Sequence, residues 1–85
     1  MSNLQKPVLS LKQFILKQEV KNLYRRIFRA IREVKDENHR KELKLWARTD
    51  FRNNANYTDE ITIKMCIKYG ERCLKELETS LNLSK

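Results

Sequence analysis

Apolar residues recur along most of this chain at intervals of three and four positions, the spacing of one face of an α-helix. At about 100° per residue, the stretch 20–34 places its apolar side chains on one arc of a helix. This arc contains Val20, Leu23, Tyr24, Ile27, Phe28, Ala30, Ile31 and Val34. The opposite arc is cationic and contains Lys21, Arg25, Arg26, Arg29 and Arg32. One helix is therefore expected to carry both a core face and an unbroken basic face.

The same spacing predicts three helices, over 11–34, 38–52 and 59–81. The expected N-caps are Ser10 for the first helix, Asp36 or Asn38 for the second and Thr58 for the third. Only one glycine and one proline interrupt the 85 residues, which favours helix throughout. We therefore predict an all-α, antiparallel three-helix bundle over 11–81, with a flexible segment at 1–10 and a tail at 82–85.

The first two turns of the first helix break this register. Leu11, Phe14 and Ile15 lie nearly opposite the main apolar arc. The favoured interpretation is that they pack against the end of the bundle, and the alternative is that they contact a second partner.

The second helix has an apolar face and a basic face. The expected inner residues are His39, Leu43, Trp46, Ala47 and Phe51, and the outer basic stripe is Lys41, Lys44, Arg48 and Arg52. Asp50 falls inside the apolar arc, where an unpaired carboxylate would be costly, so we expect a basic partner near the helix end.

The third helix carries a regular packing seam. Its members are Ile63, Ile67, Gly70, Leu74, Leu77 and Leu81. Glycine inside a helix costs about 0.5–1 kcal/mol relative to alanine, so Gly70 indicates the close approach of a neighbouring helix or, less commonly, of a ligand between helices.

The net charge of +8 is concentrated on two of the three expected helices. The first has seven basic residues against two acids, the second five against two, and the third four against five. This asymmetry indicates a surface that docks an acidic partner.

Several classes of function are disfavoured. No apolar run approaches the roughly 20 residues that span a bilayer. No phosphate-binding loop, zinc-type cluster or nucleophile–base pairing is visible, so an enzyme is not expected. Cys66 and Cys73 would lie about 10 Å apart along one helix, which exceeds disulfide reach. With His39 as the only histidine, we expect free thiols and no metal site.

The tripeptide Leu23-Tyr24-Arg25 on a basic amphipathic helix, followed by Arg26-Ile27 and by Phe51 downstream, resembles the LYR-motif (complex 1 LYR) family. The resemblance covers about 11–81. It implies a mitochondrial matrix adaptor that binds the mitochondrial acyl carrier protein. The fatty acyl chain on the carrier's 4'-phosphopantetheine would enter the helical bundle, with no cofactor bound by the adaptor itself. The pair would serve a client subunit or assembly intermediate of respiratory complex I, or related iron–sulfur proteins.

The resemblance also implies site residues. Those expected to contact the carrier or its phosphopantetheine are Tyr24, Arg25, Arg29, Lys44, Arg48 and Arg52. Tyr24 is expected at the rim of the acyl channel. Those expected to line the channel are Leu23, Ile27, Ile31, Leu43, Ala47, Phe51, Ile67 and Gly70. For each lining position, ordinary core packing is the alternative role.

Two further alternatives remain open. A basic helical domain could bind nucleic acid, although Tyr24, Phe28, Trp46 and Phe51 fall on apolar arcs and leave no stacking platform among them. The basic first helix could instead bind a membrane surface. The segment before Glu19 has lysines and no acid, which suits mitochondrial import through an uncleaved N-terminus.

Overall fold

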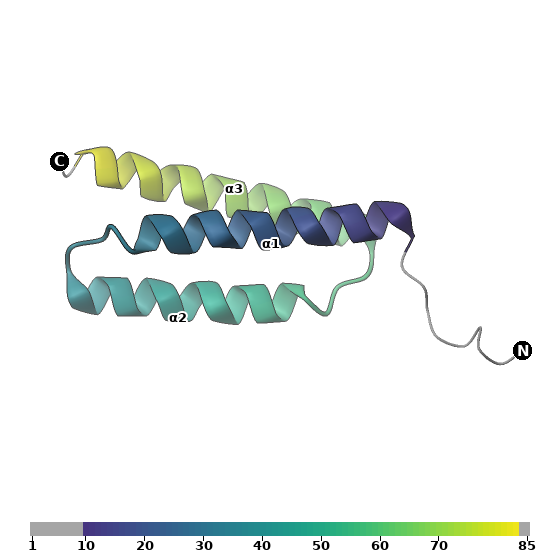
Figure 1. Ribbon diagram of the computed structural model, residues 1–85, viewed down its shortest axis with the longest axis horizontal. Coiled ribbons are helices and arrows are strands. Elements are labelled where there is room, and N and C mark those ends of the chain that lie inside the picture. Colours follow the sequence, from purple (N-terminus) through teal and green to yellow (C-terminus); the bar gives the residue numbers. More distant parts are fainter. Residues whose placement is uncertain (1–9, 84–85) are drawn as a thin grey trace, which may run out of the picture.

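The computed structural model describes residues 10–83, and all regular secondary structure within them is helical. Helix α1 covers Leu11–Ile31, α2 covers Glu37–Asn54 and α3 covers Glu60–Leu83 (Figure 1). The predicted all-α fold is confirmed. The flexible segment predicted at 1–10 falls, except for Ser10, outside the described residues, whereas the predicted tail begins inside α3.

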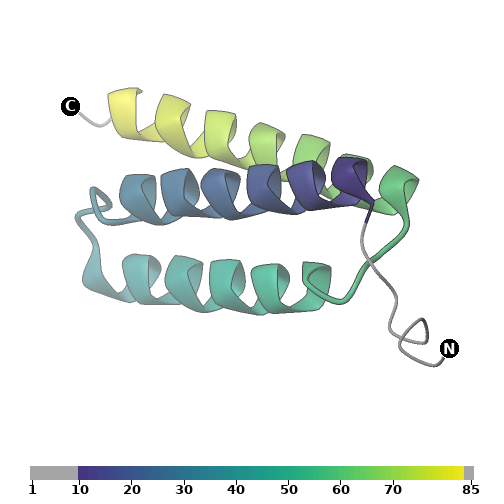
Figure 2. The same ribbon diagram turned by 45° about the vertical axis from the view of Figure 1, so that its right-hand side comes forward.

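Helix α1 is the centre of the arrangement and lies between α2 and α3 (Figures 1 and 2). Helix α2 runs antiparallel to the other two (Figure 1). Helix α1 packs extensively against α3 and less against α2, while α2 and α3 make little direct contact. Within residues 10–83, none of the three helices combines the length and apolar content needed to cross a membrane.

Each helix begins at a side chain that satisfies a free backbone N–H group. At α1, the Gln13 N–H donates to Ser10 Oγ (3.1 Å) and the Ser10 N–H donates to Gln13 Oε1 (3.0 Å), a capping box. At α2, Asp36 Oδ1 accepts from the Asn38 N–H. Both caps agree with the sequence analysis.

The cap predicted for α3 is wrong by one residue. The Thr62 N–H donates to Asp59 Oδ2 (3.1 Å), so Asp59 rather than Thr58 caps the helix. A carboxylate at this position also interacts favourably with the positive end of the helix dipole. The Thr58 carbonyl instead accepts a hydrogen bond from Gln13 Nε2 of α1 (2.7 Å).

The core follows the predicted apolar arcs, and α1 supplies most of it. Ile27 and Ile31 are fully buried, and Ala47 is the one fully buried residue of α2. Val34 is buried although α1 ends three residues earlier. His39 was predicted to face inward and is exposed, and it lines a hollow together with Leu77 and Leu81 of α3.

Gly70 allows α3 to approach α1 closely. A Cβ atom at this position would lie 2.6 Å from Leu23 Cδ2, well inside contact distance. The close approach of a neighbouring helix predicted at Gly70 is therefore confirmed, with Leu23 as the residue that occupies the space.

The favoured interpretation of the first two turns of α1 is wrong. Leu11, Phe14 and Ile15 do not pack against the bundle but are 74%, 53% and 49% exposed. The inward positions are shared by Leu16, which belongs to the core, and two polar residues: Gln13 bonds to Thr58, and Lys17 Nζ donates to the Ala55 carbonyl (3.4 Å).

Candidate functional site

A basic groove follows the seam between α1 and α2. It has a volume of about 620 Å³ and is lined by Arg25, Phe28, Arg29, Arg32, Lys44 and Arg48. The lining contains five cations and no carboxylate. Phe28 is half-buried and also packs against the core, so it separates the groove from the apolar interior.

The groove cations are not neutralised within the part of the chain that the structure describes. The ion pair found there joins Lys41 Nζ to Glu37 Oε2 (3.4 Å), outside the groove. Arg25 Nη1 donates only to the neutral Asn22 side chain (3.4 Å). Five cations that face one groove without counter-charges create a positive potential, which favours an acidic partner.

The groove brings together four of the six residues predicted to bind the carrier: Arg25, Arg29, Lys44 and Arg48. Arg52 is exposed one turn further along α2 and does not line the groove. Arg32 and Phe28 do line it and were not assigned to the site from the sequence. The signal for Arg32 was present, because it lies on the cationic arc with Arg25 and Arg29.

Tyr24 is buried, with 3% of its surface exposed, and it does not line the groove or stand at a rim. Its hydroxyl donates to Asp50 Oδ2 and accepts a hydrogen bond from Asn54 Nδ2 (2.8 Å). Its ring packs against Phe51 with a centroid distance of 5.1 Å and a tilt of 57°. Tyr24 therefore joins α1 to α2 through both its ring and its hydroxyl.

The partner predicted for Asp50 is thus wrong, because its carboxylate accepts from Tyr24 and not from a basic side chain. Asp50 projects from a different side of α2 than the basic stripe. The network continues to α3, where the Cys66 thiol donates to Asn54 Oδ1 (3.3 Å). These hydrogen bonds join all three helices at one level, although α2 and α3 make little other contact.

Burial and the neighbouring Asp50 carboxylate raise the pKa of Tyr24 well above its ordinary value of 10.0. The folded protein keeps this proton at pH values where the unfolded chain loses it. The contribution to stability is complete below pH 10.0 and is lost as the pH rises above it. We expect the free energy of unfolding, measured with urea, to fall above pH 10.0 and to fall less steeply in Tyr24→Phe.

Tyr69→Phe is the control for this pH dependence. The pKa of Tyr69 is also raised, mainly by its hydrogen bond with Cys73, but its ring is 48% exposed. Its removal should change the alkaline slope less than the removal of the Tyr24 hydroxyl. Equal slopes in the wild type and Tyr24→Phe would contradict the assignment.

All eight residues predicted to line an acyl channel belong to one continuous core. Leu23, Ile27, Ile31, Ala47 and Gly70 are buried, and Leu43, Phe51 and Ile67 are partly buried against them. These side chains fill the space between the helices, which is their packing role. A chain inserted here would have to displace some of them.

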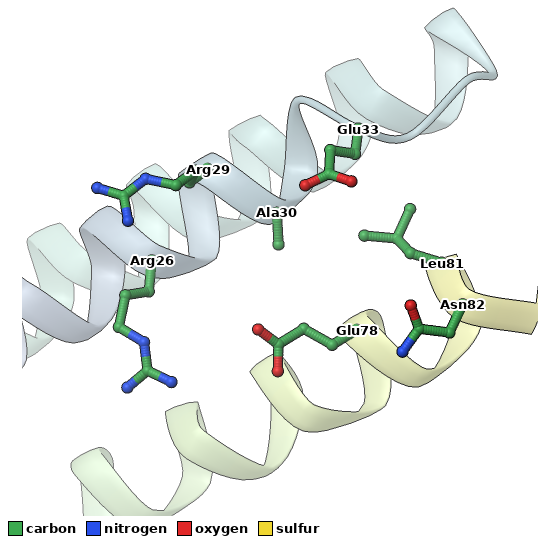
Figure 3. Close-up of a pocket in the computed structure, with 7 residues that line it drawn as sticks. All are labelled: Arg26, Arg29, Ala30, Glu33, Glu78, Leu81 and Asn82. Atoms are coloured by element: carbon green, nitrogen blue, oxygen red, sulfur yellow. The ribbon is translucent and has the colours of Figure 1, made fainter. Parts of the chain in front are cut away.

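A second groove, of about 330 Å³, lies between α1 and α3. Its lining mixes both signs of charge, with Arg26 and Arg29 on α1, Glu33 just beyond α1, and Glu78 on α3 (Figure 3). Ala30 lies between these charges on the α1 side (Figure 3). Because the charges offset one another, this groove is less suited to an acidic partner than the basic groove is.

Neither cysteine is in a disulfide, and both are half-buried. Among residues 10–83, no three His, Cys, Asp or Glu side chains come together as a metal site would require. The predicted burial of the aromatic rings holds for Tyr24, while Phe28, Trp46 and Phe51 are half-buried. Three other rings, those of Phe14, Tyr57 and Tyr69, are exposed.

The central helix carries the Leu23-Tyr24-Arg25 tripeptide and a basic face, and two further helices flank it. This combination is typical of one class of small helical protein. The chain belongs to the family described as Complex 1 protein (LYR family), whose model matches residues 18–76. It is similar to LYR motif-containing protein 2 of Homo sapiens, with 50% identity over 84 residues that cover 99% of this chain and 96% of the relative.

Similar proteins of the same name occur in other vertebrates. The identity is 44% for Xenopus tropicalis over 99% of this chain and 97% of the relative. It is 48% for Mus musculus over 98% and 94% respectively. No solved structure gives a significant match.

Proposed function

We propose that the protein is a mitochondrial matrix adaptor that binds an acyl carrier protein through the basic groove and takes the carrier's fatty acyl chain between its helices. Membership of the LYR family supports an adaptor without a catalytic role. The observation that carries the proposal is the groove of five cations without a carboxylate. Acyl carrier proteins present acidic helices around a serine that bears 4'-phosphopantetheine, and this surface is complementary to such a groove.

Arg25 is the first candidate to bind the phosphate of the phosphopantetheine arm or a carrier carboxylate. Its guanidinium can bind either group through two parallel hydrogen bonds, as can those of Arg29 and Arg48. Lys44 and Arg32 add positive charge on the two sides of the groove. Arg52, one turn beyond the groove, contributes at its edge. We assign Tyr24 to holding α2 in place rather than to contact with the carrier.

The acyl chain is proposed to enter along the seam between α1 and α2. The arm would arrive there, and Phe28 forms the boundary between the groove and the core. Helix α2 is also the least firmly packed helix, with Ala47 as its one fully buried residue. Each methylene that leaves water contributes about 0.8 kcal/mol, so a long chain could offset the repacking of the core.

The adaptor–carrier pair is proposed to act on a client subunit or assembly intermediate of respiratory complex I or a related iron–sulfur protein. The family description, Complex 1 protein, supports this choice. The experiment that tests the function is a comparison of the affinities for carrier protein with and without a fatty acyl group. If the affinities were equal, docking would remain but acyl insertion would be excluded.

A further inference from the structure

The first two turns of α1 carry apolar side chains on their outward side as well as on the inward side, where Leu16 belongs to the core. Leu11, Phe14 and Ile15 face outward and are 74%, 53% and 49% exposed. The side chains that face the rest of the protein there include Gln13 and Lys17, which donate to the backbone carbonyls of residues 58 and 55. Because these apolar side chains point away from the protein, only an apolar environment outside it can bury them.

These apolar side chains stand on an ordered helix. The capping box between Ser10 and Gln13 defines its first turn, and Gln13 also ties that turn to the α2–α3 connection. A rotation of the helix that buried Leu11 and Phe14 would break the hydrogen bonds from Gln13 and Lys17 to the α2–α3 connection. The apolar side chains are thus held in solvent by the two hydrogen bonds that join this end of α1 to the α2–α3 connection.

The outward face of α1 continues from this apolar tip as a purely basic surface. Its charged residues are Lys21, Arg25, Arg29 and Arg32, all of them exposed, and the last three also line the basic groove. Glu19, the one acidic residue of α1, projects from the flank of the helix and not from this face. An apolar tip beside exposed cations supplies both contributions that bind a helix to an anionic membrane surface, which are buried apolar area and electrostatic attraction.

We propose that this outward face of α1 binds the surface of an anionic lipid bilayer, with Leu11, Phe14 and Ile15 inserted among the acyl chains. The three side chains protrude from a single helix. A protein partner would need a pocket shaped to receive them, whereas a fluid bilayer adapts to a protruding surface. Lys21 would then lie at the level of the headgroups, where anionic lipids attract basic residues. The interaction is peripheral and does not depend on the carrier.

The test is co-flotation of the full chain with vesicles of phosphatidylcholine alone or of an equal mixture of phosphatidylcholine and phosphatidylglycerol. The wild type should float with the mixed vesicles and remain behind with the neutral ones. The insertion variant combines Leu11→Gln, Phe14→Gln and Ile15→Gln. It should reduce partitioning onto the mixed vesicles by about 10-fold or more, because the charge remains but the apolar insertion is lost.

A matched control removes three apolar residues elsewhere that are at least as exposed on average, through Leu45→Gln, Ile61→Gln and Met65→Gln. This variant should float like the wild type. Far-UV circular dichroism should be unchanged in both variants, since the replaced side chains are exposed and glutamine favours helix. Failure of the wild type to float with mixed vesicles would overturn the proposal. Equal losses in the insertion and control variants would overturn it as well, whatever the affinity for the carrier.

Discussion

Replacement of both Arg25 and Arg48 by glutamate is expected to weaken binding of an acyl carrier protein by about 100-fold or more. The two residues lie on opposite sides of the basic groove, one on α1 and one on α2. Glutamates there would face the acidic carrier with like charge, which costs several kcal/mol at a docked interface. Isothermal titration calorimetry with acylated carrier measures the effect.

The control for this result is Lys64→Glu with Lys68→Glu on α3, which makes the same change in net charge outside the groove. All four side chains are exposed, so the stability of both variants should remain within about 0.5 kcal/mol of the wild type. The control should bind the carrier with nearly wild-type affinity. An equal loss in both variants would show that net charge, and not the groove, determines binding.

Tyr24→Ala is expected to lower the free energy of unfolding by about 3–5 kcal/mol, the largest effect on stability that we predict. The substitution removes the ring that packs against Phe51 and leaves Asp50 without its hydroxyl donor. Small domains are stable by only about 5–15 kcal/mol, so this loss is a large part of the total. Urea denaturation followed by circular dichroism measures it.

Tyr24→Phe separates the ring from the hydroxyl. It keeps the packing against Phe51, and the loss of the hydrogen bond to Asp50 should cost about 1–3 kcal/mol. A loss below about 1 kcal/mol in Tyr24→Ala would contradict the role of Tyr24 as the residue that joins α1 to α2.

The three residues of the LYR tripeptide point in three directions because successive residues turn by about 100° around a helix. Leu23 reaches α3 and fills the space that Gly70 leaves open. Tyr24 reaches Asp50 on α2. Arg25 faces the basic groove. The motif therefore combines both helix contacts of α1 with the proposed docking charge in three consecutive positions.

Periodicity was sufficient to predict the three helices and their core faces, because burial of apolar side chains on one side of a helix produces that pattern directly. Periodicity was less accurate in predicting where each helix begins and ends. Val34 continues the apolar pattern but packs from the turn after α1. At α3, Thr58 and Asp59 are both common N-caps, and only the position of Thr62 in the structure decides between them.

The sequence predicted the residues of the site only where the pattern of a single helix was enough to assign them. The cationic arcs identified Arg25, Arg29, Lys44 and Arg48, which the structure brings into one groove. A helical arc does not show which neighbouring helix a residue meets, so the hydroxyl partner of Asp50 was missed. The exposure of Leu11 and Phe14 was missed for the same reason. The sequence shows that these side chains are apolar, but it does not show whether a neighbouring helix covers them.

The most direct test of the proposed function is the affinity for mitochondrial acyl carrier protein in three forms: without phosphopantetheine, with phosphopantetheine, and with a long-chain acyl group on it. If the groove binds the carrier and the core accepts the chain, affinity should rise along this series and be highest by at least about 10-fold for the acylated form, since several methylenes become buried. Absence of binding to all three forms would contradict the adaptor function itself.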